Sequence, residues 1–307
     1  MSRYSRQEIL PEVGPAGHAR LARSHVVVAG AGGLGATLLP LLAGAGVGRI
    51  TLYDPDRVEE HNLHRQTLYR MDDIGRPKAE AAARHLAALN PEIAVEAAAR
   101  PLWPDLEARS LAGADAVIDA ADMLAASYAL SDHCHASATP FITASVQGRR
   151  GYAGGFCGGV APSLRAVFPD PDPGAQSCAS AGVMGPAVAL LGALQAQMAL
   201  AVLLGHEPSP LGLMVSTDLA SWQISHFRFE GAPEPTRPLP EVVAPGQIAA
   251  GDVVIDLRRG EDATAEAPRG RRVVFLCATG LRAWRAARAL IASGHDRVAI
   301  AAAGAGP

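Results

Sequence analysis

The sequence contains few cysteines, and their spacing argues against two ways of stabilising a domain. Four cysteines occur in 307 residues, at positions 134, 157, 178 and 277, and no two of them form a C-x-x-C pair. This spacing provides neither a disulfide framework nor the thiolate pairs of a zinc site. A content of 49% hydrophobic residues supports a sizeable apolar core instead.

The chain also lacks a large excess of charge and an apolar leader. Its formal net charge is −3, which argues against general nucleic-acid binding. No apolar region of the signal-peptide type follows Met1, so we expect a cytoplasmic protein. Two uncharged runs, Val26–Gly48 and Pro173–Gly205, are broken by glycine, proline or glutamine. We interpret them as core elements that do not span a membrane.

A strand–loop–helix pattern near the N-terminus is typical of nucleotide-binding folds. The apolar run Val26–Ala29 is followed by a glycine-rich loop and then by an apolar helical run. Glycines let the backbone turn tightly and approach a phosphate, and the N-terminus of the next helix favours an anion. Asp54 lies 24 residues after Gly30, where doubly wound folds place a carboxylate for ribose hydroxyls. The candidate phosphate-binding residues are Gly30, Gly32, Gly33 and Gly35.

Three cations point to a triphosphate more than to a dinucleotide. Arg65 and Lys78 follow the loop closely, and Arg6 precedes it. Arginine matches the geometry of phosphate oxygens, and lysine adds a point charge. An NAD-dependent oxidoreductase, which would use the same loop and Asp54, leaves these cations unexplained but stays open as an alternative.

Several motifs in order resemble the ThiF/MoeB/HesA group of ubiquitin-activating-like adenylyltransferases, over roughly residues 3 to 230. These motifs are Arg3-Tyr4-Ser5-Arg6-Gln7, the glycine loop, Asp54-x-Asp56, Asn62-x-x-Arg65-Gln66, Gly75-x-Pro77-Lys78, Asp119-Ala120-Ala121-Asp122, and Ser177-Cys178-Ala179-x-Ala181-Gly182-Val183. The resemblance implies ATP-dependent adenylylation of the C-terminal glycine carboxylate of a small ubiquitin-like sulfur carrier that ends in Gly-Gly. Such a carrier serves thiamine, molybdopterin or a related sulfur pathway.

The resemblance also implies roles for individual residues. Arg6 would reach the nucleotide site of the second protomer, which implies a homodimer. Asp122, which follows a predicted strand, would hold Mg²⁺, although capping of the next helix is an alternative role. Cys178 would form a thioester or an acyl-disulfide with the carrier, with an unreactive cysteine as the alternative. The residues expected around the triphosphate are Asn62, Arg65, Gln66 and Lys78.

The sequence departs from the family pattern at two places. Met123 and Ser127 stand where relatives usually have asparagine and arginine. Ser163 and Ala166 stand where many relatives carry a C-x-x-C pair, and the second pair, expected around 229–236, is also missing. Since a thiolate zinc site needs its ligands, we predict no structural zinc.

We predict an α/β fold with a Rossmann-like, mostly parallel sheet, helices on both faces and an antiparallel extension. The extension comprises predicted strands at 141–146, 152–157, 213–216 and 223–228. Residues 1–230 would form the adenylylation domain, residues 231–245 a proline-rich linker and residues 246–307 a small second domain.

The tail resembles a rhodanese domain in pieces. Val273–Cys277 and the following Gly280 and Arg282 look like its strand, active cysteine and anion-binding loop. Loop N–H groups and Arg282 would stabilise a thiolate or persulfide on Cys277. The middle of this domain is short, so the tail is either a minor sulfurtransferase or a remnant.

Two further alternatives stay open. A relative that activates a modified tRNA base fits less well, because the Arg3–Gln7 motif is typical of the protein-carrier branch. A non-catalytic, carrier-binding scaffold is suggested by Met123 and by the shortened tail.

Overall fold

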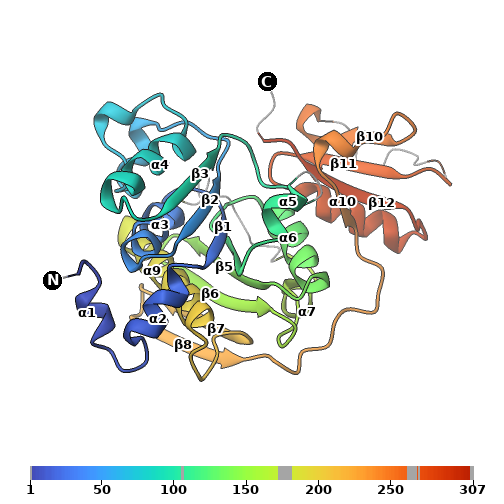
Figure 1. Ribbon diagram of the computed structural model, residues 1–307. Coiled ribbons are helices and arrows are strands. Elements are labelled where there is room, and N and C mark those ends of the chain that lie inside the picture. The colour runs from blue at the N-terminus through green and yellow to red at the C-terminus, as the bar shows by residue number, and fades with distance from the viewer. Residues whose placement is uncertain (1, 105–106, 172–181, 261–267, 269, 305–307) are drawn as a thin grey trace.

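The computed structural model describes residues 2–104, 107–171, 182–260, 268 and 270–304. Two sheets make up its framework, as Figure 1 shows. The large sheet has the strand order β3-β2-β1-β4-β5-β6-β7-β8, and the small sheet of the tail has the order β10-β11-β12-β9.

The first five strands of the large sheet are parallel, and the last three run antiparallel to their neighbours. The parallel strands are β1 (His25–Ala29), β2 (Arg49–Tyr53), β3 (Ala94–Ala98), β4 (Ala116–Asp119) and β5 (Pro140–Gln147). The antiparallel extension consists of β6 (Arg150–Cys157), β7 (Leu213–Asp218) and β8 (Gln223–Arg228). The predicted fold class is therefore confirmed.

Strand β1 is buried along its whole length because the sheet is covered on both faces. Side chains alternate between the faces of a strand, so Val26 and Val28 enter one apolar cluster, whereas Val27 and Ala29 enter another. The first cluster includes side chains of α3 (Gly33–Ala45), α4 (Lys78–Leu89) and α9 (Gly185–Leu204). The second includes side chains of α6 (Leu124–Ala136) and of the tail.

Helix α9 is long and apolar enough to cross a membrane by length and composition alone. It packs instead on α3, β5 and β6 in the first cluster. Its Gln195 is fully buried and donates from Nε2 to the backbone oxygen of Asp119 at 2.7 Å. The helix is part of the protein core, as the interrupted uncharged run predicted.

The tail contains the parallel strands β10 (Val253–Asp256), β11 (Val273–Cys277) and β12 (Val298–Ala302), with helix α10 (Leu281–Ala292) packed on them. Strand β9 (Glu241–Val242) lies inside the predicted linker and pairs with β12. The end of that segment therefore belongs to the small sheet. The other helices among the described residues are α1 (Ser5–Glu8), α2 (Gly14–Leu21), α5 (Ala108–Leu111) and α7 (Leu164–Val167). Short 3₁₀ turns lie at Glu60–Asn62, Met71–Asp73, Pro245–Gln247 and Leu257–Arg259.

Candidate functional site

The candidate site begins where the direction of the strand order changes. From β1 the chain continues to β2 and β3 on one side, and β4 then pairs with the other side of β1. Open α/β sheets bind ligands in the crevice beyond the strand ends at such a point. Gly30 follows β1 with a φ of 99°, and a Cβ there would lie 2.6 Å from the backbone oxygen of Ala120. Glycine thus allows the loop to contact the end of β4.

The remaining loop glycines are close to the next elements of the site. Helix α3 starts at Gly33, after Gly32 as its N-cap residue. A Cβ on Gly32 would lie 3.7 Å from Nε2 of Gln66, and one on Gly33 would lie 2.6 Å from Val188. At Gly35 a Cβ would lie 2.3 Å from the oxygen of Gly30, so the loop closes tightly on the helix.

Asp54 holds the glycine loop in place. Its Oδ2 accepts from the backbone N–H of Ala31 at 2.7 Å, and its Oδ1 accepts from that of Asp56 at 2.8 Å. Burial raises the pKa of Asp54, and the nearby charge of Lys78 and the two N–H groups oppose that rise. The carboxylate therefore orders the loop, whether or not it also meets a ribose.

Lys78, the first residue of α4, lies beside this carboxylate. Its Nζ donates to Oδ2 of Asp56 at 2.8 Å, and its side chain is only 6% exposed. An ammonium group has three N–H donors, so two remain for a ligand. The hydroxyl of Tyr69 donates to the oxygen of Ala31 at 2.7 Å. We did not select Tyr69 from the sequence, since a single tyrosine after the Asn62–Gln66 motif carries no chemical pattern.

The Asn62–Gln66 segment faces the loop from the side. Oδ1 of Asn62 accepts from the backbone N–H of Glu59 at 3.2 Å, so this buried side chain shapes its own turn. Gln66 is 2% exposed, and its Oε1 has no hydrogen-bond partner within the described ranges. Arg65 donates from Nη1 to the oxygen of His61 at 3.2 Å. A buried, unpaired acceptor beside the glycine loop suits a ligand with a donor group.

Asp122 follows β4 and is exposed. Met123 is the N-cap residue of α6, and that cap involves no side-chain hydrogen bond, so Asp122 does not serve as the cap. Among the described residues, no group of three or more histidine, cysteine, aspartate or glutamate side chains could hold a metal ion. A single carboxylate fits Mg²⁺ only together with oxygens from another source, such as phosphates.

A pocket of about 630 Å³ adjoins this carboxylate. Thr143, Ser145, Gly151 and Ser216, from β5, β6 and β7, contribute to its lining. Asp119 lies behind it at 1% exposure and accepts from the Thr143 hydroxyl at 2.9 Å. Burial raises the pKa of Asp119 to about 6. The sequence indicated the end of β4 but not this pocket, because its lining comes from distant strands.

Arg6 lies in the exposed turn α1, outside the crevice of its own chain. The neighbouring Gln7 donates from Nε2 to the oxygen of Ala45 at 3.0 Å, and the ring of Tyr4 packs near Gly46. Ala45 and Gly46 form the C-terminal end of α3, whereas the glycine loop lies at its start. The structure therefore brings together Lys78, Asp54, Gln66 and the loop, but not Arg6.

The two candidate cysteines have different outcomes. Cys178 lies outside the described residues. Cys277 is 1% exposed, and its Sγ accepts from the backbone N–H groups of Gly280 at 3.1 Å and Ala283 at 3.4 Å. The predicted cradle of N–H groups is therefore present, although Arg282 is exposed.

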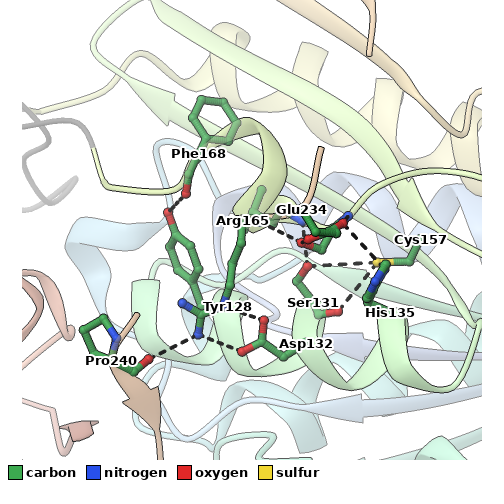
Figure 2. Close-up of polar contacts among 11 residues, drawn as sticks. Tyr128, Ser131, Asp132, His135, Cys157, Arg165, Phe168, Glu234 and Pro240 are labelled. Atoms are coloured by element: carbon green, nitrogen blue, oxygen red, sulfur yellow. Dashed lines mark hydrogen bonds and ion pairs between the residues drawn. The ribbon is translucent and has the colours of Figure 1, made fainter. Parts of the chain in front are cut away.

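A group of polar contacts surrounds Arg165 and Glu234, as Figure 2 shows. The backbone N–H and the hydroxyl of Ser163 each donate to the Glu234 carboxylate at 2.6 Å. Arg165 donates to both oxygens of Asp132, at 2.6 and 2.7 Å. A direct link thus joins the two segments in which the C-x-x-C pairs were expected.

Comparison with known proteins agrees with this geometry. The sulfur carrier protein adenylyltransferase of Thermus thermophilus is 43% identical over 212 residues, which are 67% of this chain and 78% of that protein. The SAMP-activating enzyme E1 of Haloferax volcanii is 37% identical over 240 residues, 78% of this chain and 87% of that protein. A crystal structure of E. coli MccB with MccA-N7isoASN has the same fold, with a TM-score of 0.66, 23% identity, and coverage of 77% of this chain and 74% of that chain. The sequence profile of the ThiF family matches residues 4–238, and the chain belongs to that family.

Proposed function

We propose that the protein uses ATP to adenylylate the C-terminal glycine carboxylate of a small ubiquitin-like sulfur-carrier protein. A carboxylate oxygen of the carrier bonds to the α-phosphorus, the bond from that phosphorus to the bridging oxygen breaks, and pyrophosphate leaves. The products are the acyl-adenylate and pyrophosphate. The names of the two relatives, which refer to a sulfur carrier and to SAMP, support this class of substrate.

One observation carries the proposal: the glycine loop and the pocket meet at the end of β4. Gly30 touches Ala120 and Ala121, and Ala121 and Asp122 also line the pocket. A nucleotide in the crevice would therefore present its phosphates beside a cavity that a second reactant can enter. Adenylylation needs this proximity of two bound reactants.

The charged groups of the crevice suit a triphosphate. We propose that Gly30, Gly32, Gly33 and Gly35 and the start of α3 bind phosphate oxygens through backbone N–H groups. The two remaining donors of Lys78 would bind there too, with Arg65, Asn62 and Gln66 beside them. Asp122 would hold Mg²⁺ together with the phosphates, and that ion would neutralise charge on the leaving pyrophosphate.

We further propose that Arg6 completes the site of a second copy of the chain. In its own chain it lies near the far end of α3. A homodimer that places α1 at the partner's crevice would supply the missing cation. Arg6→Ala should then lower activity without changing the fold, and mixing it with a crevice variant such as Lys78→Met should restore part of the activity.

The cradle around Cys277 supports a second candidate activity, sulfur transfer. The thiolate would attack the outer sulfur of thiosulfate, forming an S–S bond and releasing sulfite. The two N–H donors would stabilise the resulting persulfide. Incubation with thiosulfate followed by mass measurement tests this: a gain of one sulfur, lost in Cys277→Ala, is expected. Without that gain the tail is a remnant.

The decisive test of the main proposal is ATP–pyrophosphate exchange with each ubiquitin-like carrier of the source organism. Exchange should depend on one carrier and on Mg²⁺. Carrier binding without exchange would instead favour a scaffold. Binding of NAD in preference to ATP would favour an oxidoreductase, and activity on tRNA alone would favour the tRNA-modifying branch.

A further inference from the structure

The tail lies against the same pocket that we assign to the carrier. Thr279 and Leu281, from the loop that follows β11, line the pocket together with Asp122 and Leu124. Leu281 is the first residue of α10. The wall thus combines a residue of the tail helix with the segment that leads into α6.

A backbone hydrogen bond and a close glycine contact hold this wall in place. The N–H of Ala125 donates to the backbone oxygen of Thr279 at 3.1 Å. Gly280 has a φ of 97°, and a Cβ there would lie 2.7 Å from Cβ of Ala125. Real Cβ atoms essentially never approach so closely, so the loop can reach α6 only with glycine at this position.

Buried side chains fix the tail to the rest of the protein around this contact. Trp284 of α10 is 1% exposed, and its ring centroid lies 4.8 Å from that of Tyr128 in α6. The guanidinium carbon of Arg165 lies 5.2 Å from each of these rings. Nε1 of Trp284 also donates to Asp170 at 3.3 Å. These contacts connect three segments of the large domain to one face of α10.

Small residues from β5, β6 and β7 contribute to the pocket lining beside larger ones such as Tyr152, and they are Ala144, Ser145, Gly151 and Ser216. Small side chains leave room for an extended chain, and a chain that ends in glycine needs no pockets for side chains. Asp122 marks the end of the pocket nearest the glycine loop. A carboxylate that entered with its end towards Asp122 would approach the nucleotide phosphates.

We propose that Thr279 and Leu281 form a wall of the carrier pocket and help to select the glycine-ended segment of the carrier. This inference rests on the proposed function, because it assigns the pocket to the carrier. The tail would then contribute to adenylylation because it lines the pocket that binds the carrier, whether or not Cys277 carries sulfur. A larger residue at position 281 would narrow the entry, and displacement of the loop would remove the wall.

Two variants of the full chain test the wall, each with a matched control. Leu281→Trp fills the pocket, and its control is Val254→Trp, at a half-exposed position of β10 outside the pocket lining. Gly280→Ala forces the loop away from Ala125. Its control is Gly294→Ala, because Gly294 has a φ of 93° but a Cβ there would have no heavy atom within 4 Å. Both alanine variants place a Cβ on a residue with a similar positive φ.

The measurement is ATP–pyrophosphate exchange, with KM determined separately for carrier and for ATP. We expect Leu281→Trp and Gly280→Ala to raise the carrier KM about tenfold, equivalent to ~1.4 kcal/mol, with the ATP KM and both controls unchanged. An unchanged carrier KM in both variants, with wild-type exchange intact, overturns the inference and leaves the proposed function standing.

A second measurement separates the two proposals if the wild type shows no exchange. The probe is a short synthetic peptide ending in Gly-Gly with a free carboxylate, and its binding to the full chain is measured by calorimetry. Binding that is lost in Leu281→Trp but kept in Val254→Trp supports the wall even if adenylylation fails. Absence of binding to the wild type, or equal binding to all variants, overturns it.

Discussion

The nucleotide crevice draws most of its side chains from residues 30–78. The junction with the tail, in contrast, joins residues more than a hundred positions apart, as in the hydrogen bond from Trp284 to Asp170. In the crevice, one strand end, one loop and one helix start position the backbone. In the junction, aromatic rings, Arg165 and carboxylates position one another. The first kind of site depends on local spacing, and the second depends on packing between distant segments.

The comparison also shows how different groups can hold two segments together. The crevice uses a buried lysine with Asp56 and a carboxylate that accepts from two backbone N–H groups. At the junction, Ser163 and Glu234 bridge the two segments in which the family resemblance predicted C-x-x-C pairs. Hydrogen bonds to one carboxylate therefore link these two segments directly.

The largest expected effect is on activity in the crevice. Asp122→Ala should lower ATP–pyrophosphate exchange by about 100-fold or more, since it removes the proposed Mg²⁺ ligand. Its thermal unfolding should match the wild type, because Asp122 is exposed and has no ion pair among the described residues. Asp72→Ala, at another exposed aspartate, is the control. Wild-type exchange in Asp122→Ala would remove the metal role.

Substitution of a buried side chain in the junction should lower the stability of the protein. Arg165→Ala removes a buried guanidinium that binds Asp132 with two hydrogen bonds and lies 5.2 Å from the ring centroids of both Tyr128 and Trp284. We expect the free energy of unfolding to fall by about 2–4 kcal/mol in urea titrations. Arg49→Ala, which breaks the half-exposed pair with Glu96, should cost less than about 1 kcal/mol. An equal loss of unfolding free energy in Arg165→Ala and Arg49→Ala would contradict the idea that burial makes the Arg165 contacts more stabilising.

A smaller effect should appear in the pH dependence of stability. Burial raises the pKa of Asp119 to about 6 from 3.8, so the folded state favours the protonated form. The protonated Asp119 side chain therefore adds to the free energy of unfolding below pH 3.8, and this stabilisation is lost as the pH rises through about 6. Asp119→Asn cannot ionise, so its stability relative to the wild type should rise by about 2 kcal/mol between about pH 4 and pH 8. A constant difference between the two proteins over this range would contradict the assignment.

The smallest effect should come from the contact between Ser163 and Glu234. Ser163→Ala removes the hydroxyl that donates to Glu234 and accepts from the N–H of Arg165. A loss of about 1 kcal/mol is expected, because Glu234 is partly exposed and keeps one backbone donor. Ser137→Ala, at an exposed helix end, is the control. Metal analysis of the purified protein should find no stoichiometric zinc; one zinc per chain would show a ligand set that we have not identified.

The sequence alone determined the fold class and the order of the crevice elements. Strands and helices have characteristic sequence patterns, which here are short β-branched runs and an apolar helical run separated by a glycine loop. These patterns placed the strands and α3 within a few residues. Asp54 and Lys78 could be selected because motif spacing along one βαβ unit specifies where side chains stand at the ends of strands. Asp122 could be selected for the same reason.

Only the tertiary structure decided how the tail sits on the domain and what lines the pocket. Thr279, Leu281 and Gly280 meet α6 across a gap of more than a hundred residues in sequence, and no local period records such a contact. The same holds for the contacts of Arg165 with the rings of Tyr128 and Trp284, and for Ser163 with Glu234. A long-range contact requires side chains of complementary shape and polarity on both segments. Many sequences have the same local pattern of apolar and polar residues without forming that contact.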